Sequence, residues 1–120
     1  MRVLLLDDEE PLLAAIERAL IQMGHSVEYT TDAVKATRMI ETADYDVALV
    51  DYMMPVRDGI WFMKNARIPK KTKVLLMTAF VNRDVITRMF QLGACGYLIK
   101  PIEKEELALH LAFHCRDAKP

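Results

Sequence analysis

The sequence contains only two cysteines among its 120 residues, Cys95 and Cys115. A chain of this length can bury an apolar core without disulfides, so we expect both to behave as small, reduced apolar residues. The longest apolar runs hold four or five residues, as at positions 3–6, whereas a membrane-spanning helix needs about 20. The N-terminus also lacks the pattern of a signal peptide. These absences predict a cytoplasmic chain that does not enter a membrane.

The chain also lacks an excess of charge of either sign, because 16 basic and 17 acidic side chains leave a net charge of −1. No basic field therefore favours direct binding to nucleic acid. The apolar fraction of 52% and the charged fraction of 28% are those of an ordinary globular protein. We assign residues 1–116 to one domain and residues 117–120 to a tail, or to the start of a linker to an output domain.

Short apolar runs alternate along the chain with longer segments of helical periodicity. The predicted strands are residues 2–6, 26–30, 46–50, 73–77 and 95–99, and the predicted helices are residues 10–23, 33–43, 59–67, 83–92 and 103–115. The first, third and fourth strands are apolar on both faces, as in a parallel sheet that helices cover on both sides. Strict alternation of strand and helix therefore predicts a doubly wound α/β sheet with right-handed crossovers.

Residues that favour helix ends mark several of these boundaries. Pro11 suits the first turn of a helix, and Gly24 suits the left-handed residue after its end. Asp32 is positioned to cap the second helix and Gly93 to end the fourth. The first helix carries one apolar stripe at helical spacing, which consists of Leu12, Leu13, Ile16, Leu20 and Met23.

Polar side chains follow four of the five predicted strands. Asp7 and Asp8 follow the first strand, Asp51 the third, Thr78 the fourth and Lys100 the fifth. Each of these residues alone could be a loop residue or a helix cap. The carboxyl ends of parallel strands meet at one edge of a doubly wound sheet, where such folds place their sites. The joint occurrence of these residues therefore predicts one functional site.

The residue types at this edge indicate phosphoryl transfer. Three carboxylates held close together repel one another unless a cation joins them, and oxygen ligands favour Mg²⁺, which Mn²⁺ could replace. Lys100 adds a positive charge that can hold a phosphate or an ionised aspartate. Thr78 offers a hydroxyl to a phosphate oxygen. A metal-bound carboxylate beside a lysine and a hydroxyl suits transfer of a phosphoryl group to aspartate.

Four segments carry a family resemblance that covers nearly the whole chain. They are LLLDDEEP at 4–11, LVDYMMPVRDG at 49–59, LLMTAF at 75–80 and GYLIKPI at 96–102. In this order they resemble the receiver domain of bacterial two-component response regulators. The resemblance implies a chemotaxis-regulator-like fold, which is a flavodoxin-like three-layer sandwich with five helices and a five-stranded parallel sheet in the order 2-1-3-4-5.

The same resemblance implies roles for the carboxylates. Asp51 would accept a phosphoryl group from a phosphohistidine on a sensor histidine kinase or a phosphotransfer protein. Asp7, Asp8 and Asp51 would hold Mg²⁺ together with the backbone carbonyl of Met53. The domain would then be a phosphoacceptor switch in signal transduction, without turnover of external substrates.

The resemblance also implies a phosphate loop and a switch. Thr78 and Lys100 would bind the phosphoryl oxygens, and Ala79 would leave room for the loop to close on the phosphate. Pro101 stands where the family has a cis peptide bond after the lysine. Tyr97 stands at the switch aromatic position, so Thr78 would move toward the phosphoryl group and Tyr97 would follow inward.

The helix predicted at 83–92 carries more apolar residues than one buried stripe requires. Val85, Met89 and Leu92 suit the core, while Ile86 and Phe90 form a second pair near the predicted switch tyrosine. This pair could belong to a wide buried arc, but we favour an exposed face for a partner. The expected partners are an output domain or another protein, and they could include a second copy in a phosphorylation-dependent homodimer.

Three positions depart from the family pattern. Met53, two residues after Asp51, and Phe80, two residues after Thr78, stand where the family often has polar residues. Bulky apolar side chains there cannot orient the water that hydrolyses an aspartyl phosphate, which predicts slow self-dephosphorylation. The equal alternative is that both side chains simply pack against neighbours. Trp61 replaces a residue that is usually polar, and we expect it to be an exposed aromatic without a role.

Two alternative functions use the same residues. An aspartate-based phosphatase needs a second aspartate two residues after the nucleophile, where this chain has Met53. A degenerate receiver that only docks partners would not need the intact Asp51, Thr78 and Lys100. Both alternatives are therefore less favoured than the signalling switch.

The three histidines do not indicate a metal site. His110 and His114 are four residues apart, as in some zinc sites, but the sequence suggests no further ligand. His25 lies in a predicted turn, and we expect it to be exposed to solvent.

Overall fold

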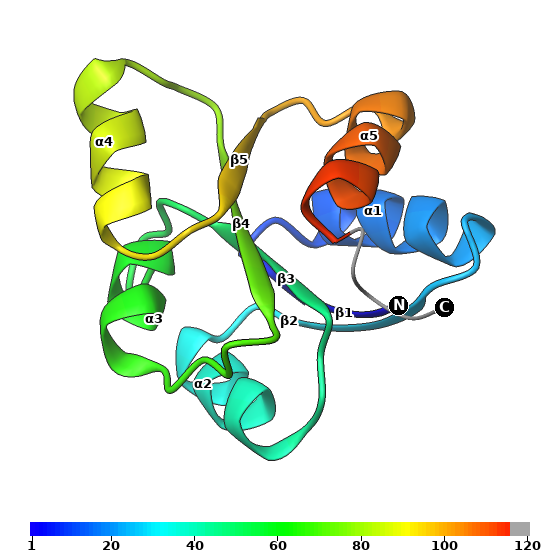
Figure 1. The fold of residues 1–120 in the computed structure, drawn as a ribbon, viewed down its shortest axis with the longest axis horizontal. Helices are drawn as coiled ribbons and strands as arrows, with labels where there is room; N and C mark the ends of the chain where they lie inside the picture. Colours follow the sequence, from blue (N-terminus) through cyan, green and yellow to red (C-terminus); the bar gives the residue numbers. More distant parts are fainter. Residues whose placement is uncertain (116–120) are drawn as a thin grey trace.

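The structure is a computed structural model and describes residues 1–115. Strands and helices alternate along the chain (Figure 1). The strands are β1 (Arg2–Leu6), β2 (Ser26–Thr30), β3 (Val47–Asp51), β4 (Lys73–Thr78) and β5 (Gly96–Ile99), and the helices are α1 (Glu10–Gln22), α2 (Ala33–Thr42), α3 (Gly59–Asn65), α4 (Arg83–Gln91) and α5 (Lys104–His114). Each predicted boundary lies within two residues of the observed one. The tail proposed at 117–120 lies outside the described residues.

The five strands form one parallel sheet in the order β2-β1-β3-β4-β5, which confirms the predicted fold class. Helices α1 and α5 lie on one face of the sheet, and α2, α3 and α4 lie on the other (Figure 1). Every residue of β3 is buried, because this central strand is covered on both faces. The three layers therefore follow from the apolar character of the central strands.

The strand register fixes where polar side chains meet. Asp7, directly after β1, comes next to Asp51, the last residue of β3. Thr78 ends β4, and Lys100 directly follows β5 on the far side of β4. Because the strands are parallel, all of these residues lie at the carboxyl edge of the sheet.

The predicted helix ends are confirmed. Pro11 lies in the first turn of α1, and the Asp32 carboxylate accepts a hydrogen bond of 2.9 Å from the Val34 N–H at the start of α2. Gly24 and Gly93 follow α1 and α4 with φ values of 93° and 103°. Left-handed backbone of this kind is strained for residues with a side chain, so glycine is required at both turns.

Two expectations about exposure are wrong. His25 is half-buried, and its Nδ1 lies 3.0 Å from the amino group of Met1, which directly precedes β1. Trp61 is also half-buried, since α3 packs against α2 and carries its ring into the apolar cluster on that face. The guanidinium of Arg57 lies 5.5 Å from the centre of the Trp61 ring, as in a cation–π contact.

Within residues 1–115, no helix has both the length and the apolar character needed to cross a membrane.

Candidate functional site at the carboxyl edge of the sheet

Three carboxylates converge where β1 and β3 end. Asp7, Asp8 and Asp51 each place one carboxylate oxygen within 4.8 Å of the others. Asp7 is fully buried and Asp51 is 4% exposed, while Asp8 faces solvent. Two of the three acidic groups are therefore removed from water, so their mutual repulsion is only weakly screened.

Lys100 supplies the positive charge nearest to this cluster. Its Nζ lies 2.9 Å from Oδ2 of Asp7 and 3.3 Å from Oδ1 of Asp51. A third carboxylate, that of Glu9, lies 3.5 Å away. The peptide bond between Lys100 and Pro101 is cis, as the family resemblance implied. One ammonium group thus bridges the ends of β1 and β3 from the end of β5.

The charge states follow from burial and from these neighbours. Burial and, to a lesser extent, the nearby Asp7 raise the pKa of Asp51 to about 7, while Lys100 acts in the opposite direction. Burial alone would lower the pKa of Lys100, but Asp7 and Asp51 together hold it above its usual value. Lys100 therefore stays protonated and offsets part of the carboxylate repulsion.

The donor set fits a hard divalent cation. Oδ1 of Asp7 accepts a hydrogen bond of 3.0 Å from the Glu9 N–H. Oδ2 of Asp7 is buried, and it has no well-aligned hydrogen bond although the Lys100 ammonium lies 2.9 Å away. A carboxylate oxygen paired with one ammonium still has a lone pair for a cation, and oxygen-only ligands suit Mg²⁺. These residues thus meet the requirements of a magnesium site.

Comparison with known proteins agrees with this geometry. The profile of the response regulator receiver domain matches residues 3–112. The chain belongs to the response regulator receiver family. Sequence relatives include the transcriptional regulatory protein DltR of Streptococcus agalactiae, which is 31% identical over 98% of this chain. The transcriptional regulatory protein TcrA of Mycobacterium tuberculosis is 36% identical over 92% of it.

This receiver domain spans only part of those relatives, namely 53% of DltR and 44% of TcrA. Among solved structures it is similar to the chemotaxis protein CheY4 of Vibrio cholerae, with a TM-score of 0.87, 29% identity and coverage of 93% of this chain and 96% of that one. It is also similar to the receiver domain of the sensor histidine kinase PA1611 of Pseudomonas aeruginosa. That comparison gives a TM-score of 0.81 and 27% identity over 93% of this chain and 94% of the other. The PA1611 domain was solved with a magnesium ion coordinated in its active-site cleft.

The hydroxyl of Thr78 is occupied by its own loop in this receiver domain. Thr78 Oγ1 donates to the Phe80 carbonyl at 3.0 Å and accepts from the Phe80 N–H at 3.2 Å. The hydroxyl proton is therefore not available to another acceptor until the loop after β4 changes. Ala79, between them, is exposed.

The remaining predicted residues lie around this edge or on the face beside it. Met53 and Phe80 are 63% and 66% exposed, so the alternative that they are packed against neighbours is wrong. Tyr97 is half-buried, and its ring meets that of Phe90 edge-on at 6.4 Å. Phe90 is 49% exposed and Ile86 is half-buried, so this pair is neither wholly core nor wholly surface.

Sequence reasoning missed Gly59, which positions Asp51. A Cβ atom on Gly59 would lie 2.3 Å from the Asp51 carbonyl oxygen and 3.0 Å from the Tyr52 Cα. The first residue of α3 must therefore be glycine for the helix to start this close to the end of β3. The Asp-Gly pair at 58–59 within the matched family segment was the available signal. Asp58 caps α3 by accepting a 3.1 Å hydrogen bond from the Trp61 N–H.

We predict that Asp51→Asn stabilises the metal-free domain more at pH 8 than at pH 5. The pKa of Asp51 is raised to about 7 in the folded state, so folding stability falls as pH rises from the unfolded pKa of about 4 to the folded value. Asparagine does not titrate, and the variant should gain about 1–3 kcal/mol relative to the parent over this range. Urea unfolding in EDTA at the two pH values measures the difference. An equal gain at both values would show that Asp51 does not titrate in this range.

We predict that Gly59→Ala weakens both folding and the site. The added methyl group must displace the Asp51 backbone, which should cost about 1–3 kcal/mol and lower Mg²⁺ affinity. The matched variant Asp58→Ala removes only the helix cap, at a cost of about 1 kcal/mol, and should keep Mg²⁺ affinity. Denaturant unfolding and Mg²⁺ titration of both variants test this, and equal Mg²⁺ affinities would contradict it.

Proposed function

We propose that this receiver domain is a phosphoacceptor switch in which Asp51 takes a phosphoryl group from a phosphohistidine of a sensor histidine kinase or a phosphotransfer protein. The observation that carries the proposal is the contact of Lys100 with both Asp7 and Asp51 inside a cluster of three carboxylates. Burying two carboxylates beside a third is costly for folding, whereas a phosphoryl site uses such a group of charges.

Asp7, Asp8 and Asp51 would hold Mg²⁺ with the backbone carbonyl of Met53, and Mn²⁺ could take its place. Support comes from the three carboxylate oxygens, which all lie within 4.8 Å of one another, and from the magnesium ion in the related PA1611 receiver domain. When bound, the cation would neutralise the carboxylates and the negative charge of the incoming phosphoryl group.

The transfer itself needs little from the protein beyond position and charge. A carboxylate oxygen of Asp51 forms a bond to phosphorus while the phosphorus–nitrogen bond of phosphohistidine breaks, and its electron pair stays on the imidazole. Lys100, already 3.3 Å from Asp51, would hold a phosphoryl oxygen. Thr78 would bind another oxygen after its hydroxyl leaves Phe80. The expected product is an aspartyl phosphate, without turnover of an external substrate.

The proposed switch begins when the Thr78 hydroxyl gives up its hydrogen bonds to Phe80, because this step would carry the change from the site to the partner face. Phosphorylation adds negative charge that favours the conformer in which Thr78 faces the phosphoryl group. The loop around Ala79 would close, and Tyr97 would move further inward, away from Phe90. The face of α4, β5 and α5 that includes Ile86, Phe90 and Tyr97 would then change its affinity for a partner.

The partners of this switch follow from the family. Receiver domains of response regulators interact with histidine kinases and with output domains, and the matched relatives DltR and TcrA are transcriptional regulatory proteins longer than this chain. An attached or separate output domain, or a phosphorylation-dependent homodimer, would use the face of α4, β5 and α5. Such a switch would work in the cytoplasm, without direct contact to nucleic acid.

We predict that acetyl phosphate with Mg²⁺ adds one phosphoryl group to the parent domain, detected by intact mass. Asp51→Asn should give no adduct, and EDTA should suppress labelling because the carboxylate repulsion is then not relieved. Lys100→Met should fold but label at least about tenfold more slowly, since it removes the only cation at Asp51 within the described residues. Labelling of Asp51→Asn at the parent rate would place the acceptor elsewhere and refute the proposal.

We predict a long-lived phosphate, because exposed Met53 and Phe80 offer no polar group to orient an attacking water. Met53→Asn combined with Phe80→Glu should speed loss of the phosphoryl group by about tenfold or more. The decay is followed by intact mass after removal of acetyl phosphate. Met53→Leu combined with Phe80→Leu serves as the apolar control and should decay like the parent. An unchanged rate of phosphoryl loss in the variant with Met53→Asn and Phe80→Glu would contradict the proposed role of these two side chains.

A further inference from the structure

Glu9 lies directly before α1, at the position where a side chain can cap the helix. Short polar side chains such as those of serine and aspartate are preferred there, because they accept a hydrogen bond from the first turn. The Glu9 side chain makes no such bond. A carboxylate near the start of a helix is also favourable for the helix dipole, but that effect requires no particular direction of the side chain. The direction that Glu9 takes is therefore not explained by α1.

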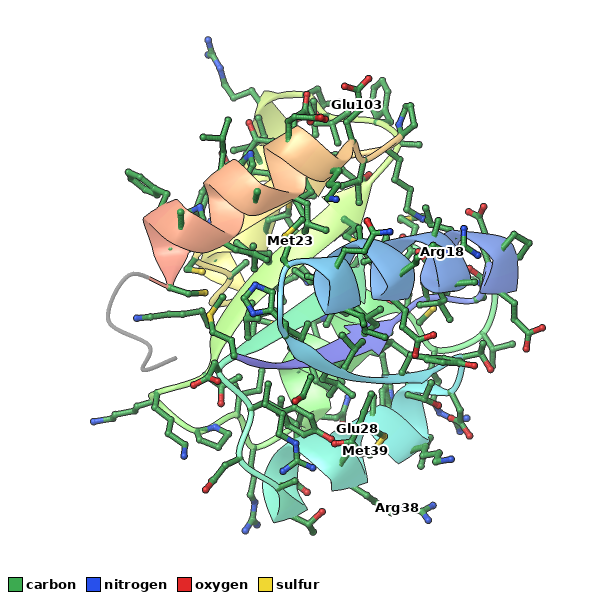
Figure 2. The ribbon with its side chains drawn as sticks, turned by 90° about the vertical axis from the view of Figure 1, so that its right-hand side faces the viewer. Arg18, Met23, Glu28, Arg38, Met39 and Glu103 are labelled. Carbon is green, nitrogen blue, oxygen red and sulfur yellow. The ribbon has the colours of Figure 1, made fainter. Side chains whose placement is uncertain are left out.

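The backbone of Glu9 is held on both sides, and its side chain reaches across the site. Its N–H donates to Oδ1 of Asp7 at 3.0 Å, and its carbonyl accepts from the Leu13 N–H at 3.0 Å. Its Oε1 accepts a hydrogen bond of 3.5 Å from Nζ of Lys100. In Figure 2, the starts of α1 and α5 lie at the same end of the molecule, with Glu103 marking the start of α5. The contact therefore joins the residue before α1 to the residue after β5.

Lys100 is in contact with three carboxylates at once. Its Nζ lies 2.9 Å from Asp7, 3.3 Å from Asp51 and 3.5 Å from Glu9. An ammonium group has three N–H donors and no acceptor. An oxygen of an incoming phosphoryl group can therefore bind Lys100 only after one of the three carboxylates gives up its place.

Glu9 is the carboxylate that can leave Lys100 at the lowest cost. Asp7 and Asp51 are 0% and 4% exposed, and a buried carboxylate that loses its cation is strongly destabilising. The Glu9 side chain is 63% exposed and makes the longest of the three contacts. Water replaces this contact as soon as the side chain turns away, so breaking it costs little.

We propose that Glu9 is a positioning residue that occupies the place of a phosphoryl oxygen at Lys100 until a phosphodonor displaces it. This inference rests on the proposed role of Asp51 as phosphoacceptor. Glu9 does not touch the reacting atoms, and it acts through Lys100. In the resting domain it competes with anionic donors for the ammonium group. It therefore raises the donor concentration that half-maximal labelling of Asp51 requires.

Labelling with acetyl phosphate at saturating Mg²⁺, followed by intact mass, tests the competition. Glu9→Gln removes the charge and keeps the size of the side chain. It should lower the half-saturating concentration of acetyl phosphate by about two- to fivefold, which is the effect of one exposed ion pair. The maximal rate should stay that of the parent, because a saturating donor has displaced Glu9 in every molecule. The rate at low donor concentration should rise by the same factor.

Glu10→Gln is the matched control. Glu10 is the next residue, is exposed in the first turn of α1, and has no ion pair with Lys100 in the described part of the chain. The control removes the same charge from the same end of the molecule and should keep the half-saturating concentration of the parent. An equal decrease in both variants would show that net charge, and not the contact with Lys100, sets this concentration. That result would overturn the inference.

Glu9→Asp tests whether reach matters as well as charge. This variant keeps the carboxylate but shortens the side chain by one methylene group, and aspartate at this position is a preferred cap for α1. Its carboxylate should therefore bond to the first turn of α1 instead of Lys100. The half-saturating concentration should fall as in Glu9→Gln, and circular dichroism should show the fold of the parent in both. A value equal to that of the parent would contradict the proposed contact.

The outcomes separate this inference from the proposed function. A parent domain without an adduct, or Asp51→Asn labelled at the parent rate, would refute the role of Asp51 and the inference with it. Labelling of the parent at Asp51 with an unchanged half-saturating concentration in Glu9→Gln would overturn only the role of Glu9. A lower maximal rate in Glu9→Gln would also overturn that role, because Glu9 would then assist the transfer instead of competing with the donor.

Discussion

The contact between the Lys100 ammonium and the carboxylates of Asp7 and Asp51, at 2.9 Å and 3.3 Å, is the interaction on which the rest of the site depends. Two buried carboxylates beside each other would be strongly unfavourable without a cation. Lys100 offsets only part of this repulsion, because burial and Asp7 still raise the pKa of Asp51 to about 7. Part of the carboxylate repulsion therefore remains, and a bound divalent cation would relieve it.

The backbone of the sheet places these charged side chains next to one another. Parallel strands bring Asp7, Asp51 and Lys100 to one edge. Asp7 follows β1 and Asp51 ends β3, which are buried strands that cannot shift without exposing apolar side chains. Gly59 lets α3 begin against the carbonyl of Asp51, which fixes the loop that carries Met53. The hydrogen bonds between Thr78 and Phe80 hold the loop after β4, which the proposed switch would require to move. A charge cluster placed by the sheet beside such a loop would be a physical basis for the proposed two-state switch.

Much of the fold and of the candidate site could be predicted from the sequence, because the signals were local. Apolar runs, Pro11 and the glycines at 24 and 93 marked the elements, and strict alternation of strand and helix gave the sheet. Local signals could not show that Trp61 packs against the apolar cluster on its face of the sheet or that His25 meets the N-terminus, because those contacts depend on tertiary structure. The need for Gly59 arises from the distance between two backbone segments, which no local pattern in the sequence reveals.

The central claim is that the carboxylates of Asp7, Asp8 and Asp51 form one cation site. Calorimetric titration with Mg²⁺ tests it most directly. The account predicts binding of one ion to the parent domain and at least a tenfold loss of affinity, about 1.4 kcal/mol, in both Asp7→Asn and Asp51→Asn. Unchanged affinity in these variants, or no Mg²⁺ binding by a folded parent, would contradict it.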